Sequence, residues 1–150
     1  MRLEELCVFE WRYDAEGRLP DGGLVVIRPY GGEEGSAYGE GSGTVRGERI
    51  TGTVSWSNHP HRRSDGRMLP DVHGLIVTDD DARIVFELRG RTVFDAAGNR
   101  GAQSLIGIFE SADSRYAWLN DVVCVAEGQI VFESNRIEIH VYEAVNELVE

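Results

Sequence analysis

The stretch that decides the fold is ERITGTVSWS, residues Glu48–Ser57. Its apolar and small residues occupy every second position: Ile50, Gly52, Val54 and Trp56. Successive side chains of an extended chain point to opposite faces, so these residues share one face and their polar neighbours share the other. The alternation predicts a β-strand with one buried face, on which Trp56 points toward the protein interior.

The same period-two alternation recurs on both sides of this stretch, whereas helical periodicity is scarce. Toward the N-terminus, Leu6–Tyr13 places Cys7, Phe9, Trp11 and Tyr13 on one face. Further strands are predicted at Leu24–Ile27, Val72–Thr78, Arg83–Phe94, Ser104–Ser111, Tyr116–Ala126, Gln129–Glu133 and Arg136–Tyr142, with a helical turn at Glu143–Val149.

The spacing of these segments indicates the fold class. Strands that recur about every 8–15 residues, joined by Gly, Asp and Asn turns, are typical of an antiparallel barrel or sandwich. A closed barrel has no edge strands, and eight strands enclose an interior just wide enough for one small ligand. We therefore predict an all-β protein, a single domain over residues 1–150: an antiparallel β-barrel of about eight to ten strands with an interior cavity. Within the glycine-rich tract Gly31–Gly47, the segment GGEEGSAYGEGSG, Gly31–Gly43, is expected to form a mobile flap or a wide hairpin.

The charge of the chain excludes several classes of partner. Its 26 acidic residues outnumber 15 basic ones, all of them Arg, and the net charge is −11. Such a surface repels phosphate backbones and anionic membranes, so we expect neither a nucleic acid nor a membrane as partner. The absence of Lys excludes Schiff-base catalysis. Without a membrane-length apolar run or a signal pattern in Met1–Glu10, the expected location is cytoplasmic.

The two cysteines, Cys7 and Cys124, lie in apolar segments and lack the CxxC spacing of a metal or redox site. We expect both to be buried thiols that behave as small hydrophobic residues. A nucleophilic role for Cys124 is disfavoured, because its neighbours in VVCVA supply no base.

The polar loop that follows the deciding stretch is the first candidate site. Arg63 can clamp a carboxylate or an enolate, and Asp65 can act as a base if burial raises its pKa toward 7. Asn58 and Asp71, at the two ends of the loop, are predicted to bind the ligand. The alternative is an ion pair between Arg63 and Asp65 that only locks the turn.

Three consecutive aspartates, Asp79, Asp80 and Asp81, follow the next predicted strand. Adjacent carboxylates usually form a solvated hairpin tip, and their spacing does not fit a calcium loop. We expect Asp79 to be the one that can point into the barrel and touch a ligand, because it is in phase with Leu75 and Val77.

Histidines in and near the polar loop are candidate metal ligands. His59, His61 and His73, together with Asp65 and Asp71, could supply enough ligands for zinc or iron. The chain has no paired Cys and no helical HxxxH, and a His-Pro-His loop is more often polar surface. We expect no metal, and in the absence of a phosphate-binding loop we expect no cofactor.

The segment RYAWLN supplies a second wall of the candidate site. Tyr116, Trp118 and Asn120 alternate along a predicted strand and so project to one face. The two rings offer flat walls for a ligand, and the Asn120 amide can polarise a carbonyl or hold an enolate. The alternative is that the rings are core and that Asn120 caps a turn. On the last strand, His140 is expected to face outward, opposite the more apolar set.

Several of these segments resemble one family. YGEGSGTVRGERITGTVSWSN, RRSDGRMLPDVHGLIVTDD, RYAWLN and VYE are similar to the bacterial domain of unknown function 3237, over about Tyr38–Ala144. The resemblance implies an antiparallel barrel related to the allene oxide cyclase and dirigent-type barrels, several of which guide cyclisations or isomerisations without a cofactor. The chain departs from the family at Asp81, where Gly is common, and at Ser57–Arg63, where many members carry Gly-Gly-Ala-Asp-Trp.

These observations predict a barrel that binds a small apolar or aromatic metabolite, such as a polyketide or terpenoid intermediate, and promotes a cofactor-independent isomerisation, cyclisation or lyase step. Trp56, Tyr116 and Trp118 would shape the ligand, and Asp65 would carry the proton. One alternative is a non-catalytic ligand carrier on the same scaffold. Another is a structural homo-oligomer, since apolar strand faces left over after closure favour self-association.

Overall fold

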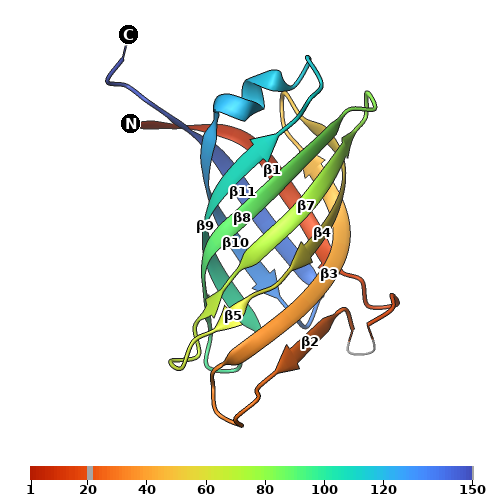
Figure 1. The fold of residues 1–150 in the computed structure, drawn as a ribbon, viewed down its shortest axis with the longest axis vertical. Helices are drawn as coiled ribbons and strands as arrows, with labels where there is room; N and C mark the ends of the chain where they lie inside the picture. The colour runs from red at the N-terminus through yellow and green to blue at the C-terminus, as the bar shows by residue number, and fades with distance from the viewer. Residues whose placement is uncertain (20–21, 150) are drawn as a thin grey trace.

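The computed structural model describes residues 1–19 and 22–149 and shows a closed antiparallel β-barrel (Figure 1). Its barrel strands are β1 Arg2–Tyr13, β3 Gly35–Arg46, β4 Thr51–Asn58, β7 Asp71–Thr78, β8 Arg83–Phe94, β9 Arg100–Glu110, β10 Val123–Val131 and β11 Arg136–Val145. Around the barrel they follow the order β1, β11, β10, β9, β8, β7, β4 and β3, and β3 pairs with β1 to close it. The prediction of an all-β antiparallel barrel is confirmed.

Three short strands and one helix distinguish the two ends of the barrel. β2 (Leu24–Ile27) pairs with β3, while β5 (His61–Arg62) and β6 (Met68–Leu69) connect β3 to β8 at the end that we call the mouth end. The 3-10 helix η1 (Ala117–Asp121) lies at the opposite end, which we call the helix end (Figure 1). Because neighbouring strands are antiparallel, β1, β4, β8 and β10 finish at the mouth end.

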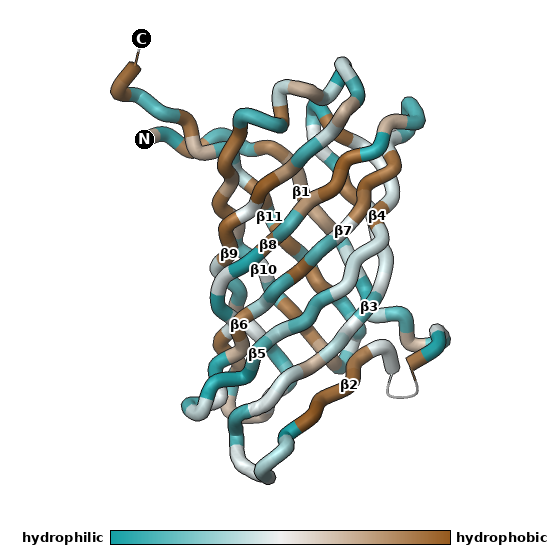
Figure 2. The backbone as a smooth tube through the Cα atoms, in the orientation of Figure 1, coloured by the Kyte–Doolittle hydropathy of each residue, from teal (hydrophilic) through white to brown (hydrophobic). Residues whose placement is uncertain are grey.

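The inner face of the barrel carries the alternating apolar residues. On β1, Cys7, Phe9, Trp11 and Tyr13 are all buried, as predicted from the sequence. Trp56 of β4 is also buried, which confirms its inward orientation. The hydropathy of the tube alternates along the strands in the same way (Figure 2). The alternation of side chains along each strand therefore produces an apolar inner face and a polar outer face. The apolar side chains of the different strands pack against one another inside the barrel.

Aromatic rings stack on one another from the middle of the barrel to its mouth. Trp11 stacks on Trp56 with ring centroids 5.4 Å apart, and Trp56 meets Tyr13 edge-on at 5.2 Å. Tyr13 stacks on Phe132 at 6.0 Å, and Phe132 stacks on Phe94 at 5.6 Å. We call these five residues the ring column. It occupies the mouth half of the interior, so the space open to a ligand lies at its outer end.

Inward-facing glycines of β3 make room for the ring column. A Cβ placed on Gly39 would lie 2.9 Å from the ring of Tyr13, and a Cβ on Gly43 would lie 2.8 Å from the ring of Trp11. On Gly41 it would overlap both the ring of Trp56 and the backbone of β1. The tract that the sequence predicted as a mobile flap or wide hairpin is therefore a regular strand over much of its length. β2 and β3 do form a hairpin, with residues 28–34 as its connection. The sequence missed the regular strand because glycine is usually depleted in strands, whereas here its missing side chain is what the packing requires.

Two further expectations are corrected near the C-terminus. The predicted strand Tyr116–Ala126 contains the 3-10 helix η1, and the strand β10 starts only at Val123. β10 then continues into the separately predicted segment Gln129–Glu133 and ends at Val131. β11 runs on to Val145, so residues 143–145, expected to begin a helical turn, continue the strand instead, and residues 146–149 have no regular structure. Pairing with β1 and β10 extends β11 beyond its local pattern, whereas Ala117–Asp121 form a helix that caps the barrel instead of pairing with a strand.

His140 and the cysteines lie as expected. Ile139 and Val141 of β11 face the core, and the half-exposed His140 between them lies on the outer wall. Cys7 and Cys124 are both buried free thiols, and burial raises the pKa of each to about 12. They therefore remain protonated at neutral pH. Among the described residues, no helix is long and apolar enough to cross a membrane.

The role of Gly41 predicts the effect of one added methyl group. Gly41→Ala should lower the free energy of unfolding by about 1–3 kcal/mol, because the Cβ forces the Trp56 ring or the β1 backbone to move. Urea denaturation followed by tryptophan fluorescence measures this change. Gly32→Ala is the matched control, because a Cβ there meets no atom within 4 Å. Equal stability of the two variants would contradict the packing role of Gly41.

Candidate ligand site

A groove opens at the mouth end, beside the outer end of the ring column. Its volume is about 460 Å³, within the range of about 300–1,000 Å³ that small-molecule sites occupy. The large apolar side chains of its lining are those of Leu24, Val26, Met68, Phe94 and Phe132. These residues come from β2, β6, the end of β8 and the residue after β10, so segments far apart in the sequence build one floor. We call this site the mouth groove.

The rim of the mouth groove is charged. Glu33, between β2 and β3, pairs with Arg62 of β5, and Asp65 and Arg67 follow on the β5–β6 turn. Asp95, on the opposite side, holds the β8–β9 turn because its carboxylate accepts backbone N–H groups there. Both signs of charge thus surround an apolar floor. Such a site takes an apolar ligand body and orients its polar substituents at the edge.

Asp65, the residue predicted to carry a proton, is exposed on this rim. Its carboxylate accepts two hydrogen bonds from the guanidinium of Arg63, at 2.8 and 3.1 Å, and one from the backbone N–H of Arg67 at 3.1 Å. The hydrogen bonds from Arg63, and then the one from Arg67, lower the pKa of Asp65 from its ordinary 3.8. A base that acts at neutral pH needs the opposite shift. The geometry is that of the alternative, an ion pair that locks the turn.

Asn58 and Asp71, predicted to bind the ligand, join β4 to β7 at the mouth end. The side-chain oxygen of Asn58 accepts the backbone N–H of Asp71 at 3.0 Å. The Asp71 carboxylate lies on the outer wall, 3.0 Å from Nε2 of His73 and 3.3 Å from Nε of Arg89. Neither residue belongs to the lining of the mouth groove. Their contacts instead hold two strand ends close to its rim.

The three histidines of this region have separate environments. Nε2 of His61 lies 3.5 Å from a carboxylate oxygen of Glu34, and Nδ1 of His73 lies 3.5 Å from one of Glu87. The ring of His59 is 6.3 Å from that of His73. In the part of the chain that the structure describes, no three His, Cys, Asp or Glu side chains group as metal ligands.

The second predicted wall of the site lies at the other end of the barrel. Tyr116, Trp118 and Asn120 belong to η1 and its N-terminal cap, so they do not alternate along a strand. Both ends of the Asn120 amide bind the backbone, since its oxygen accepts the N–H of Ser111 at 2.8 Å and its nitrogen donates to the Ser111 carbonyl at 2.9 Å. The guanidinium of Arg49 stacks over Trp118 at 3.4 Å. Since Asp65 lies at the mouth end, the structure does not bring these two groups of residues together.

Of the three consecutive aspartates, Asp80 rather than Asp79 has side-chain partners that link elements. Its carboxylate accepts hydrogen bonds from the hydroxyls of Tyr116, at 2.8 Å, and Thr78, at 2.5 Å, which lower its pKa. Asp79 is exposed, and the inward phase of β7 is that of Ile76 and Thr78, not that of Leu75 and Val77. The expectation that Asp79 points into the barrel was wrong, because the phase of a strand is set by the neighbours it pairs with.

Sequence reasoning missed the residues that form the floor of the mouth groove. Phe94 and Phe132 each end a strand-like segment just before a turn, and nothing local shows that their rings will stack. The available signal was positional: an aromatic residue that follows the inward phase of a strand to its last position reaches the mouth of a barrel. Sequence reasoning also missed Arg62 and Arg67, which flank the predicted Arg63 and Asp65 and lie on the rim of the groove.

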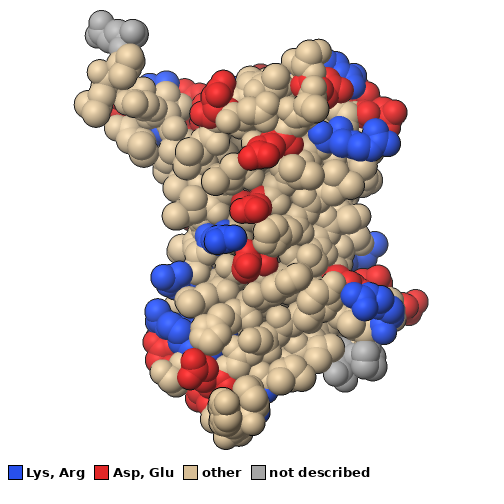
Figure 3. All heavy atoms as spheres, viewed as in Figure 1, with Lys and Arg blue, Asp and Glu red and all other residues tan. Residues whose placement is uncertain are grey.

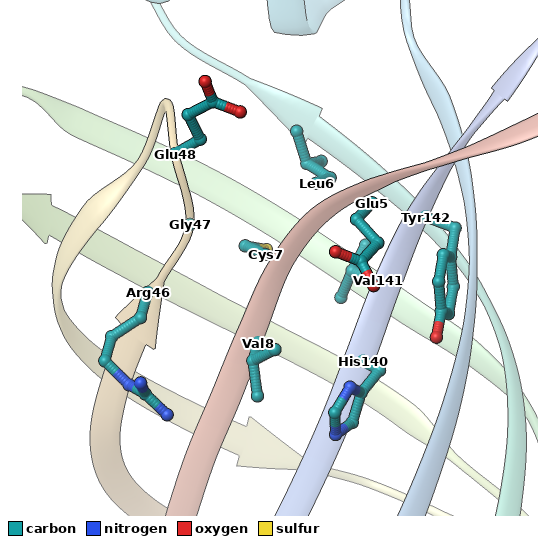
Figure 4. Close-up of a pocket in the computed structure, with 10 residues that line it drawn as sticks. All are labelled: Glu5, Leu6, Cys7, Val8, Arg46, Gly47, Glu48, His140, Val141 and Tyr142. Carbon is teal, nitrogen blue, oxygen red and sulfur yellow. The ribbon is translucent and has the colours of Figure 1, made fainter.

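A second pocket, of about 260 Å³, lies on the outer wall where the pairing of β1 with β11 shifts between Glu5 and Cys7 (Figure 4). Figure 4 shows Arg46 and His140 on either side of β1. His140 is engaged with Glu138, at 2.8 Å from Nε2 to the carboxylate. Because the Cys7 thiol remains protonated, it does not supply a nucleophile to this pocket.

The outer wall over β8, β9 and β10 carries exposed apolar residues between charged ones, and β8 itself directs Arg83, Glu87, Arg89 and Arg91 outward. The face in Figure 3 shows charged residues gathered at the two ends of the barrel, with only a short column of charge between them. Val85, Ile106, Ile108 and Val123 are exposed large apolar residues on these strands. Ile108 pairs with Val123 across β9 and β10, so part of this set is contiguous. Self-association through this wall stays a prediction.

A closed eight-stranded antiparallel barrel with a groove at its mouth defines the structural class. Residues 31–144 match the model of a family described as protein of unknown function, DUF3237, and the chain belongs to this family. The resemblance found in the sequence is thereby confirmed. No curated protein shows a significant match.

Several solved structures share the fold. A β-barrel-like protein from Acinetobacter baumannii AYE is 19% identical with a TM-score of 0.78, over 95% of this chain and 94% of that one. A protein of unknown function from Clostridium acetobutylicum is 19% identical with a TM-score of 0.81, over 97% and 100% of the two chains. A protein from Penicillium herquei, described as an enzyme, is 24% identical with a TM-score of 0.59, over 95% and 94%. At these identities the likeness shows the fold alone.

The environment of Asp65 predicts its titration. Carboxyl-carbon NMR should give a pKa below the ordinary 3.8, and Arg63→Gln should move it back toward that value. Because the folded pKa is the lower one, the ion pair contributes stability above the ordinary pKa, and this contribution is lost as the pH falls through the folded value. A pKa near 7 would restore Asp65 as a candidate base.

Proposed function

We propose that this protein binds a small, largely apolar, ring-containing metabolite in the mouth groove. The observation that carries the proposal is the stacked pair Phe94 and Phe132 on the groove floor, with ring centroids 5.6 Å apart. Tyr13 supports the pair from inside by stacking on Phe132. A floor held in this way offers a flat apolar surface that does not have to be ordered when the ligand binds, which favours affinity.

The charges at the rim support the choice of ligand. Arg62 is neutralised by Glu33, and Asp65 by Arg63, so the groove presents paired charges at its edge. These pairs are exposed and can donate to or accept from polar substituents without a large desolvation cost. A ligand with an apolar ring body and a few polar groups at its periphery fits both parts of the site.

A cofactor-independent isomerisation, cyclisation or lyase step on the bound metabolite is the second candidate function. It is favoured by the similar structure from Penicillium herquei, which is described as an enzyme. In this chain the groove would act mainly by shape, because holding a flexible substrate near its reactive geometry removes part of the barrier. The low pKa of Asp65 keeps this carboxylate ionised, so it does not supply the proton.

Binding of a fluorescent probe tests the proposed site. 8-Anilinonaphthalene-1-sulfonate has an apolar ring body and one polar substituent, and its fluorescence should increase on binding to the protein. Phe94→Ala should weaken its affinity about tenfold, since loss of the ring removes a stacking partner worth about 1.4 kcal/mol. A fluorescence titration measures both dissociation constants.

Ile108→Ala is the matched control, because it removes an exposed apolar side chain from the outer wall. It should leave the affinity unchanged. If both variants weaken binding equally, or if neither does, the probe does not bind in the mouth groove and the proposal fails. Mass spectrometry of a co-purified ligand after incubation with the protein then distinguishes binding from catalysis. A carrier returns the ligand unaltered, whereas an enzyme converts it.

A further inference from the structure

A block of four apolar side chains lies on the outer wall where β9 and β10 pair. Ile106 and Ile108 of β9 are 58% and 48% exposed, and Val123 of β10 is 53% exposed. Ile108 pairs with Val123, and Ile106 pairs with the half-exposed Val125, so the four side chains are direct neighbours across the two strands. Contiguous apolar side chains that remain exposed on a folded domain are typical of a protein-interaction surface.

The block is symmetric about a line that crosses β9 at Gly107. Ile106 and Val125 form the row on one side of this line. Ile108 and Val123 form the row on the other side. In a two-fold dimer each contact occurs twice, because residue i of one copy meets residue j of the other and j meets i. A two-fold axis along this line, parallel to the wall, therefore places Ile106 of each copy opposite Ile108 of the other. It places Val123 opposite Val125 in the same way.

Charged residues on β8 follow the same symmetry. Glu87 lies beside Ile108, and Arg89 lies beside Ile106. The same axis places Glu87 of each copy opposite Arg89 of the other, so unlike charges meet at this edge of the block. Within one copy, the Arg89 guanidinium lies 3.3 Å from the carboxylate of Asp71 and 4.0 Å from that of Glu87. The edge therefore contains both signs of charge before the copies meet.

Two further exposed charges, Arg91 and Glu110, lie at equal distances from the line. Arg91 pairs with Ser104, three residues before the line along β9, and Glu110 lies three residues after it and pairs with Val85. In the part of the chain that the structure describes, neither side chain takes part in an ion pair, and the Arg91 guanidinium donates to the carbonyl of Gly90 at 2.8 Å. The axis brings Arg91 of each copy over Val85 of the other, next to Glu110.

The wall is hollowed at the place where Arg91 of a second copy would arrive. The hollow has a volume of about 370 Å³, and its lining includes Val85, Ile108, Glu87 and Glu110. It thus combines apolar side chains with two carboxylates. A long side chain with an apolar stem and a cationic end, such as that of Arg, fits both parts of this lining.

We propose that two copies of the chain form a two-fold dimer through the outer wall of β8, β9 and β10, in which Arg91 of each copy enters the hollow of the other and pairs with Glu110. The occupant is a second copy because the wall is complementary to itself: each apolar row meets an apolar row, and each charge meets its opposite. The surface lies outside the mouth groove, so this inference does not depend on ligand binding there.

Charge reversal tests the dimer. Analytical ultracentrifugation of the wild-type protein should show twice the mass of one chain. Arg91→Glu and Glu110→Arg should each raise the dissociation constant of the dimer about tenfold, because each places like charges together at two symmetric contacts. The double variant Arg91→Glu/Glu110→Arg restores unlike charges and should return the dissociation constant to within about threefold of the wild-type value.

Arg12→Glu is the matched control, because Arg12 is exposed on β1, outside the proposed interface, and its reversal changes the net charge by the same amount. It should leave the dissociation constant unchanged. Ile106→Glu tests the apolar block and should abolish the dimer, while far-ultraviolet circular dichroism checks that the barrel is intact. A monomeric wild-type protein, or a dimer that neither Arg91→Glu nor Ile106→Glu weakens, would overturn the proposal. A double variant that dissociates as readily as the single variants would also overturn it, since the reversed pair would then not form.

Discussion

The packing of aromatic rings against the inward glycines of β3 is the interaction on which the rest of the structure depends. Because Gly39, Gly41 and Gly43 present no side chain to the interior, the rings of Tyr13, Trp56 and Trp11 can lie against the strand itself. Overfilling such a core costs stability, so each ring requires a glycine beside it. The rings also contact one another in succession, from Trp11 through Trp56 and Tyr13 to the residues at the mouth of the barrel.

This packing also determines where a groove with an aromatic floor forms. The rings take up the mouth half of the interior, so the last members of the ring column form the floor of the mouth groove. At the helix end, the hydrogen bonds of Tyr116 with Asp80 and of Asn120 with Ser111 tie η1 to the strands. The two ends therefore differ in structure: one carries a groove with an aromatic floor, and at the other hydrogen bonds hold η1 against the strand ends.

Much of the fold could be predicted because the side chains of a strand alternate with a period of two. β8 was predicted with its observed bounds, Arg83–Phe94, and the inward orientation of Trp56 was predicted from its phase with Ile50 and Val54. The segment RYAWLN does not follow this rule. Tyr116 and Trp118 alternate with smaller residues as they would on a strand, yet the segment forms a 3-10 helix, because it caps the barrel rather than pairing with it. Alternation without a pairing partner is not a strand.

By itself, the sequence determined the fold class, the acidic surface, the absence of Lys chemistry and the inward set of most strands, since each follows from composition or from a local period. Only the tertiary structure decided which of the many polar residues come together. Asp65 and Asn120 looked like parts of one site, but barrel closure places them at opposite ends. Phe94 and Phe132 lie far apart in the sequence, yet they form one floor. Distance in space between distant segments depends on strand order and register, which local patterns do not encode.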